Sequence, residues 1–392
     1  MEFSLAVKRV YHIFVRELYI MWRNPIYGFC SFVFPLMVAV FFTTLMQEGE
    51  PTDMPVGVVD QDNTSATRAM IRKLDAFQTT HVVAHYANMN DARQAIQRNE
   101  IYAFLLIPKG TTDDLLSSHQ PKISFYYSSV TMVAGSLLFR DLKTIASLGS
   151  ANVGATKLAA IGKTTDEIRT FLQPINIDLH MVGNPWANYN IYLSTVMVPG
   201  VLMVFIFLLV PYSIGTELKF HRSRQWINSA GGNIHIAIMG KVLPQTLVAC
   251  CVLLCYEFYI FYGLDFPHPG GVLPILLAGI LSVLACQCFG IFVFGLMPSL
   301  RMSMSICSLW SVVSFSACGA TFPLFAMDPM IQSMGQLFPL RHFYMIYQMC
   351  IFNGYPLSYA WFNIMALAIF LFLPMFTIRH IKTAMIKYEY IP

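Results

Sequence analysis

Six long apolar segments divide the chain. Each offers about 20 largely uncharged residues, the length that an α-helix needs to cross the hydrocarbon layer of a membrane. They run near Tyr27–Met46, Leu193–Ser213, Val242–Gly263, Val272–Leu296, Met302–Phe322 and Tyr359–Ile378, the fifth being the least apolar because it is rich in serine. The pattern predicts a multi-pass α-helical membrane protein with six transmembrane helices.

A different pattern fills residues 47–192, between the first and second apolar segments. The run Val56–Val59 is β-branched apart from one glycine and meets the polar turn Asp60–Asn63; apolar residues then recur at helical spacing up to Phe77. Strand-like and helix-like runs continue to alternate through HVVAHY, MNDARQAIQRNE, IYAFLLIP, GTTDDLLSS and KISFYYSS. This β-α-β-α-β-α-β order predicts an inserted α/β domain with a small open sheet. Residues 130–172 predict one or two long helices leading back to the membrane.

Composition supports this division of the chain. The 392 residues are 56% hydrophobic and only 12% charged, whereas soluble domains carry about 25% charged residues. Residues 47–192 hold 12 of the 25 Lys and Arg residues and 14 of the 21 Asp and Glu residues. An ordinary polar domain is therefore embedded in a membrane protein.

Positive charge predicts the orientation of the bundle. Twelve Lys and Arg residues flank one side of the six segments and one, Arg341, lies on the other. Because cationic loops stay in the cytoplasm, we expect both termini to be cytoplasmic and residues 47–192 to be extracytoplasmic. The cationic leader before Tyr27 is too long, and followed by no cleavage site, for a removed signal peptide.

No motif in the sequence predicts catalysis or a cofactor site. The pair Gly240-Lys241 lacks the upstream glycine and the Ser or Thr of a P-loop, since Val242 follows it. All nine cysteines lie in or beside the apolar segments, so the polar domain has no disulfide framework. We expect this chain to bind no metal, cofactor or nucleic acid.

Several stretches, in order along the chain, resemble landmarks of the type-2 ABC exporter permeases, in the branch with a large extracytoplasmic domain after the first helix. They are RELYIMWRNPIYGFCSFVFPLMV, VGVVDQDNTSATR, NPWANYNIYLSTVMVPGVLM, GTELKFHRSRQWINSAGGNIHIAIMGKVLP and FPLFAMDPMIQSMGQLFPLRHFYMIYQMCIFNG. The resemblance covers essentially the whole chain. One departure is that Gly215-Thr216 precedes Glu217, where many members have Glu-Arg-Glu-x-Gly-Thr.

The resemblance implies a domain plan. Residues 1–26 form a cytoplasmic amphipathic entry helix, 27–46 the first membrane helix and 47–192 the extracytoplasmic domain. Residues 193–380 supply the other five helices, with a cytoplasmic coupling loop at 214–241 and an external hairpin at 323–358, and residues 381–392 form a cytoplasmic tail.

The resemblance also implies a function. The chain is expected to be the permease subunit of an ABC exporter in the bacterial cytoplasmic (inner) membrane, moving a hydrophobic or amphipathic small molecule or lipid outwards. ATP and Mg²⁺ are expected on a separate ATPase subunit. A second copy or a similar permease, membrane lipids and a periplasmic adaptor are further expected partners. The alternative is a receptor or secretion-system scaffold whose external domain binds a ligand or partner, although the short tail after Lys387 offers no output domain.

The loop at 214–241 carries the residues expected to contact the ATPase: Glu217, Arg222, Arg224, Trp226 and Ile227. A short amphipathic helix showing Trp226 and Ile227 on one face suits a groove in a partner protein. The alternative is a juxtamembrane helix with extended cationic side chains and an interfacial tryptophan.

Two further ionisable residues are candidates for the pathway or gate. Glu257 lies within the third apolar segment among tyrosines and either lines the substrate path, relays a proton or is simply hydrogen-bonded to a tyrosine. Arg341 either forms a salt bridge in a dimer gate or contacts a lipid head group.

Overall fold

A computed structural model describes residues 2–117, 119–130, 132–174, 180, 184 and 187–388. The chain forms two compact units, one of residues 48–180 and one of residues 1–47 and 181–392. The smaller unit ends at His180, before the boundary at 192 expected from the sequence.

The unit of residues 48–180 is built on a four-stranded sheet with the order β2-β1-β3-β4. Strand β1 (Met54–Asp60) pairs in parallel with β2 (Thr80–His85) and with β3 (Ala103–Ile107). Strand β4 (Ser124–Tyr127) is antiparallel to β3. The buried apolar run of β1 is typical of a parallel strand covered on both faces.

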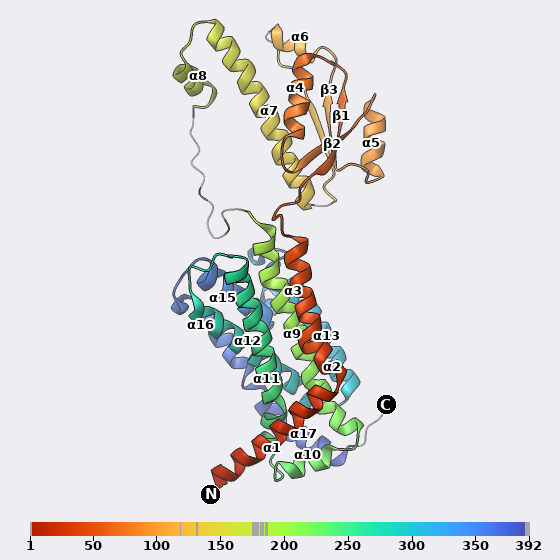
Figure 1. Cartoon of the computed structure of the whole chain (residues 1–392), viewed down its shortest axis with the longest axis vertical. Helices are drawn as coiled ribbons and strands as arrows, with labels where there is room; N and C mark the ends of the chain where they lie inside the picture. The colour runs from red at the N-terminus through yellow and green to blue at the C-terminus, as the bar shows by residue number, and fades with distance from the viewer. Residues whose placement is uncertain are drawn as a thin grey trace. The chain divides into compact units, whose positions relative to one another are not determined.

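Helices cover both faces of this sheet. Helices α4 (Ser65–Asp75) and α7 (Met132–Ala160) share a core with β1 and β3, and α5 (Met89–Gln97) packs on the opposite face (Figure 1). Helix α4 begins where the Thr64 side chain accepts a hydrogen bond from the Thr67 amide. Together with α6 (Thr111–Leu116) and α8 (Thr165–Leu172), the elements follow the order that the sequence pattern predicted.

The larger unit is a helical bundle. Among the residues that the structure describes, five helical stretches are long and apolar enough to cross a membrane: Pro25–Leu45, Tyr189–Lys219, Ile234–Gly263, Val272–Leu296 and Leu357–Lys387. Helix α9 (Tyr189–Lys219) is buried along most of its length and packs against α3 (Phe34–Leu45), α12 (Val272–Leu296) and α13 (Leu300–Ala317).

Two of these stretches contain a turn of π-helix, and one is interrupted. The first span comprises α2 (Pro25–Gly28), the π-helix η1 (Phe29–Val33) and α3. Helix α11 (Ile234–Phe258) continues as the π-helix η2 (Tyr259–Gly263). The last span comprises η5 (Leu357–Ala360), α16 (Trp361–Phe370) and α17 (Leu373–Lys387). The break before α17 coincides with Pro374, which cannot continue the preceding hydrogen-bond pattern.

The fifth apolar segment of the sequence differs from the other five. It corresponds to α13, which ends at Ala317 rather than near Phe322 and falls short of the apolar character of a span among the described helices. Six serines within its 18 residues explain the difference. The structure thus supports five of the six expected spans, and a sixth remains a prediction.

The segment expected as an external hairpin, residues 323–358, folds into short helices. They are η3 (Leu324–Ala326), α14 (Pro329–Gly335), α15 (Pro339–Ile346) and the π-helix η4 (Tyr347–Phe352). Nearly every side chain of α15 is buried against α12 and α16. This part of the hairpin therefore belongs to the core of the bundle.

Two helices lie at the end of the bundle where α9 ends and α11 begins. They are α1 (Glu2–Arg23), which packs along α11, and the short α10 (Ser223–Ser229), which contacts α1, α11 and α17 (Figure 1). This end of the bundle contains the candidate functional site.

Candidate functional site

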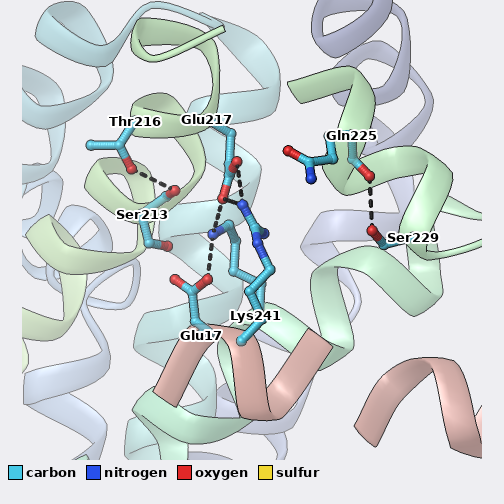
Figure 2. Close-up of polar contacts among 8 residues, drawn as sticks. Glu17, Ser213, Thr216, Glu217, Gln225, Ser229 and Lys241 are labelled. Carbon is cyan, nitrogen blue, oxygen red and sulfur yellow. Dashed lines mark hydrogen bonds and ion pairs between the residues drawn. The ribbon is translucent and has the colours of Figure 1, made fainter. Parts of the chain in front are cut away.

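Four charged side chains from three helices meet next to α10. The Lys241 ammonium on α11 donates hydrogen bonds to Glu17 Oε2 on α1 at 2.7 Å and to Glu217 Oε1 at the end of α9 at 2.9 Å. Arg16 Nη2 donates to both carboxylate oxygens of Glu217, at 2.8 and 2.9 Å. Figure 2 shows Glu17 and Glu217 on opposite sides of Lys241. We call these four residues the ionic cluster.

Burial makes the ionic cluster sensitive to any change in charge. The side chains of Glu17, Glu217 and Lys241 are each 1% exposed, and that of Arg16 is 22% exposed. Two cations and two anions balance, and removing one partner of such a buried pair is strongly destabilising. Among the described residues, Arg16 Nη1 and Glu17 Oε1 are buried without a hydrogen-bond partner. The cluster is neutral as a whole but incompletely hydrogen-bonded.

Gly240 allows α1 to approach α11 closely enough to form the cluster. A Cβ atom at this position would lie 2.7 Å from Ile13 Cβ and 3.0 Å from the Val10 carbonyl oxygen. A side chain there would push α1 away from α11, because one of these two atoms belongs to the backbone. The glycine next to Lys241 thus sets the distance across which Glu17 and Lys241 pair.

Helix α10 is fixed to the cluster through its buried face. Trp226 is 0% exposed and Ile227 is 3% exposed, and the Lys241 ammonium lies 5.3 Å from the centroid of the Trp226 ring, within the range of a cation–π interaction. In the chain by itself these two side chains are therefore not on the surface, and a contact between them and a partner stays a prediction. The amphipathic pattern of α10 arises because α10 packs against α1 and α11.

The exposed face of α10 is polar. Arg224, Gln225 and Asn228 are exposed, and Arg222 is partly exposed. Arg224 Nη2 donates a hydrogen bond to the Ile386 carbonyl on α17 at 3.3 Å, and Ser229 Oγ donates to the Gln225 carbonyl (Figure 2). This face, rather than Trp226, is available for contact with another protein.

The connection between α9 and α11 is shorter than the coupling loop at 214–241 expected from the sequence. Residues 214–219 complete α9 and residues 234–241 begin α11, which leaves residues 220–233 around α10. Because α9 extends to Lys219, Glu217 lies in the last turn of a membrane-spanning helix rather than in a loop.

Within this connection Gly231 adopts φ +68°, and a Cβ there would overlap the Arg9 guanidinium.

Glu257 is buried in α11 at 3% exposure. Its Oε2 has no hydrogen-bond partner among the described residues, while the neighbouring Tyr256 hydroxyl donates to the Ser194 carbonyl at 2.7 Å. The hydrogen bond from a tyrosine to Glu257, one of the alternatives from the sequence, is not seen at this oxygen. A role in the pathway stays a prediction.

Arg341 is buried in α15 at 6% exposure rather than placed on a surface. In the described part of the chain it forms no salt bridge with a carboxylate. Its Nη1 donates a long hydrogen bond of 3.5 Å to the Gln332 carbonyl. Its neighbour His342, which the sequence did not single out, links α15 to Asn363 of α16 at 3.0 Å and to the Gln336 carbonyl at 2.8 Å. The two residues contribute to the packing of the hairpin in this structure, and a gate role for Arg341 stays a prediction.

The described residues contain no group of three or more His, Cys, Asp or Glu side chains placed to hold a metal ion. The charged groups of the ionic cluster are instead committed to one another.

Comparison with known proteins identifies the family of this chain. The family model described as ABC-2 family transporter protein matches residues 26–378. The chain belongs to the ABC-2 transporter family. Among its relatives is the linearmycin resistance permease protein LnrN of Bacillus subtilis (strain 168), which is 18% identical over 355 residues, or 86% of this chain and 89% of the relative. The resemblance drawn from the sequence is confirmed.

Membership in the ABC-2 family makes this chain a multi-pass membrane subunit of a transporter rather than an enzyme. Permeases of this family generally work with an ABC ATPase subunit. A contact between that subunit and Glu217, Arg222, Arg224, Trp226 or Ile227 is tested neither by the family match nor by the structure of a single chain.

The sequence pattern singled out only Glu217 of the four residues in the ionic cluster. Arg16, Glu17 and Lys241 were not among the residues expected to form a site. A signal was present, since Glu17 is the one acidic residue between Phe3 and Glu48. An anion inside an apolar helical surface usually has a buried cationic partner.

Proposed function

We propose that this chain is the permease subunit of an ATP-driven exporter that moves a hydrophobic or amphipathic small molecule or lipid out across the bacterial cytoplasmic membrane. ATP and Mg²⁺ bind to a separate ABC ATPase, and the permease works as a homodimer or beside a similar permease. The name of the relative LnrN, a resistance permease, supports export of a toxic compound. The unit of residues 48–180 lies outside, where it receives cargo or contacts a periplasmic adaptor.

The ionic cluster is the observation that carries this proposal. It joins the entry helix α1, the end of α9 and the start of α11 next to α10. α9 is the central helix of the bundle. A push on α10 therefore reaches α9 through the contact of the Trp226 ring with Lys241 and the hydrogen bond from Lys241 to Glu217.

The exposed face of α10 supplies the surface on which the ATPase acts. The ATPase contacts the exposed residues Arg224, Gln225 and Asn228. The buried side chains of Trp226 and Ile227 hold α10 against the bundle, so a displacement of α10 also displaces the helices beside it. This division assigns different roles to residues that the sequence grouped together. Glu217 couples by bonding to Lys241 and Arg16, without touching the ATPase.

Co-purification with an ATPase tests the proposal. The chain is expressed with the ABC ATPase encoded nearest to its gene, solubilised in detergent and captured by a tag on the permease. We expect the ATPase to co-purify and to hydrolyse ATP. Arg224→Glu should weaken its binding at least about tenfold, which corresponds to about 1.4 kcal/mol.

Lys122→Glu serves as the matched control, because it inverts an exposed cation in the unit of residues 48–180. Equal ATPase binding by the Arg224 and Lys122 variants would remove α10 as the contact surface. Failure of any ABC ATPase to co-purify with the unmodified chain would contradict the proposed function itself.

A further inference from the structure

A cavity of about 550 Å³ lies among the membrane-spanning helices α3, α9 and α11, with one further wall residue from each of η1 and η2. This volume is in the range of about 300–1,000 Å³ typical of small-molecule sites. Leu36 and Leu247, on two of its sides, are 54% and 52% exposed, so the cavity opens to the surface of the bundle. Hydrocarbon surrounds the bundle there if these helices span the membrane as their length and composition predict.

The cavity is elongated and largely apolar. Its wall along α11 and the start of η2 runs from Leu247 to Tyr259, about 18 Å at the helical rise per residue. Its wall carries no Asp, Glu, Lys, Arg or His among the described residues. An alkyl tail can fill such a space without leaving a polar group unsatisfied.

One end of the cavity is polar but uncharged. The Tyr259 side chain forms part of the wall there, and its hydroxyl lies 3.4 Å from Thr43 Oγ1, on a residue outside the wall. A hydroxyl group can exchange hydrogen bonds with a neutral polar head group. The site therefore matches a molecule with a long apolar tail and an uncharged polar end.

Irregular helix geometry distinguishes this cavity from an ordinary groove between helices. Phe32 lies in the π-helix η1, Tyr259 begins the π-helix η2, and Pro199 interrupts the hydrogen bonding of α9, and all three line the cavity. Such π-turns occur frequently at functional sites, and a proline inside a helix allows a kink. Three spans thus depart from regular helix geometry around one space.

We propose that this cavity binds the alkyl tail of the exported amphiphile, with the uncharged head group beside Tyr259 and Thr43. The proposal rests on the proposed export function and specifies where the cargo enters the permease from the membrane. Tail binding between α3 and α9 acts on the same α9 that carries Glu217 of the ionic cluster in its last turn.

Native cysteines provide the first test. Cys251 and Cys255 line the cavity and are exposed, whereas Cys30 and Cys288 are partly buried outside it. The purified permease in phospholipid nanodiscs is treated with N-ethylmaleimide, and modification of each cysteine is followed by peptide mass spectrometry. A long-chain monoacylglycerol is the probe, and glycerol is the control without a tail.

At a probe concentration about nine times its Kd, about one tenth of the sites are free, so modification of Cys251 and Cys255 should slow about tenfold. Modification of Cys30 and Cys288 should be unchanged, and glycerol should have no effect. Slowing at all four cysteines, or at none, would overturn the proposal. This arm needs no ATPase, so its outcome is separate from that of the proposed function.

The second arm distinguishes cargo from ordinary bilayer lipid. Cys255→Trp fills part of the cavity, and Val312→Trp adds the same side chain at an exposed position of α13 outside it. In the complex with the ATPase, the monoacylglycerol should raise ATP hydrolysis of the unmodified and Val312→Trp proteins but not of the Cys255→Trp protein. Stimulation that persists in Cys255→Trp would mean that bilayer lipid alone occupies the cavity, and would overturn the proposal.

Discussion

Replacing Lys241 by methionine tests how much the permease depends on its ionic cluster. Methionine keeps the length and the apolar part of the side chain but removes the ammonium group. Glu217 would keep Arg16 as a partner, whereas Glu17 would lose its hydrogen bond of 2.7 Å and remain buried at 1% side-chain exposure. The Trp226 ring would also lose its cation.

The expected magnitude follows from these contacts. Breaking a buried ion pair by removing one partner costs about 3–5 kcal/mol, whereas replacing both partners by neutral groups is often nearly neutral. We therefore expect Lys241→Met to lower the Tm by roughly 6 °C or more, at about 2 °C per kcal/mol for a unit of this size. The double variant Glu17→Gln/Lys241→Met, which removes one charge of each sign, should recover most of this loss.

Thermal unfolding in detergent provides the assay. A fluorogenic thiol dye reports the exposure of buried cysteines such as Cys286 as the temperature rises. Lys387→Met is the matched control, because this lysine is exposed at the end of α17, and its Tm should stay within about 2 °C of the unmodified protein. If the single and double variants lose the same Tm, Glu17 and Lys241 are not energetically coupled and the role given to the cluster is wrong.

Three other predictions concern topology, α10 and pH. Cysteines at the exposed positions Asp113 and Asp166 should react with an impermeant thiol reagent added outside cells with a permeabilised outer barrier; a cysteine at Lys387 should not, and its labelling would reverse the orientation. Trp226→Ala should cost about 3–5 kcal/mol of stability, because the ring is fully buried; an unchanged Tm in the thiol-dye assay would contradict this packing. Hydrogen bonds from the Thr112 hydroxyl and from the amides of Gly110 and Thr112 hold the pKa of Asp62 below its ordinary value, so its stabilising effect is present at neutral pH and is lost as the pH falls through that lowered pKa. Asp62→Asn should therefore speed hydrogen exchange of the Gly110 amide at neutral pH. In the variant, lowering the pH should change the protection of this amide less than it does in the unmodified protein. An exchange profile equal to that of the unmodified protein would show that Asp62 does not stabilise this turn.

The sequence by itself determined the elements with strong local signals. Apolar length fixes five of the spans, because a backbone in hydrocarbon must satisfy its own hydrogen bonds within a helix. The buried run of β1, the polar turn after Asp60 and the Thr64 cap are adjacent in the chain, so local preferences suffice to place the first strand and helix of the sheet. The serine content of α13 explains why apolar character was a weaker guide there.

Only the tertiary structure decided which side of α10 is buried and which charges meet. An amphipathic pattern reveals an apolar face but does not say whether that face packs inside the chain or against a partner. In the folded chain Trp226 is buried in the same apolar cluster as Ile13 of α1. Glu17 and Lys241 are 224 residues apart in the chain, too far for any local pattern to pair them. The cavity among α3, α9 and α11 likewise depends on where three spans diverge, which is a property of their packing and not of any one segment.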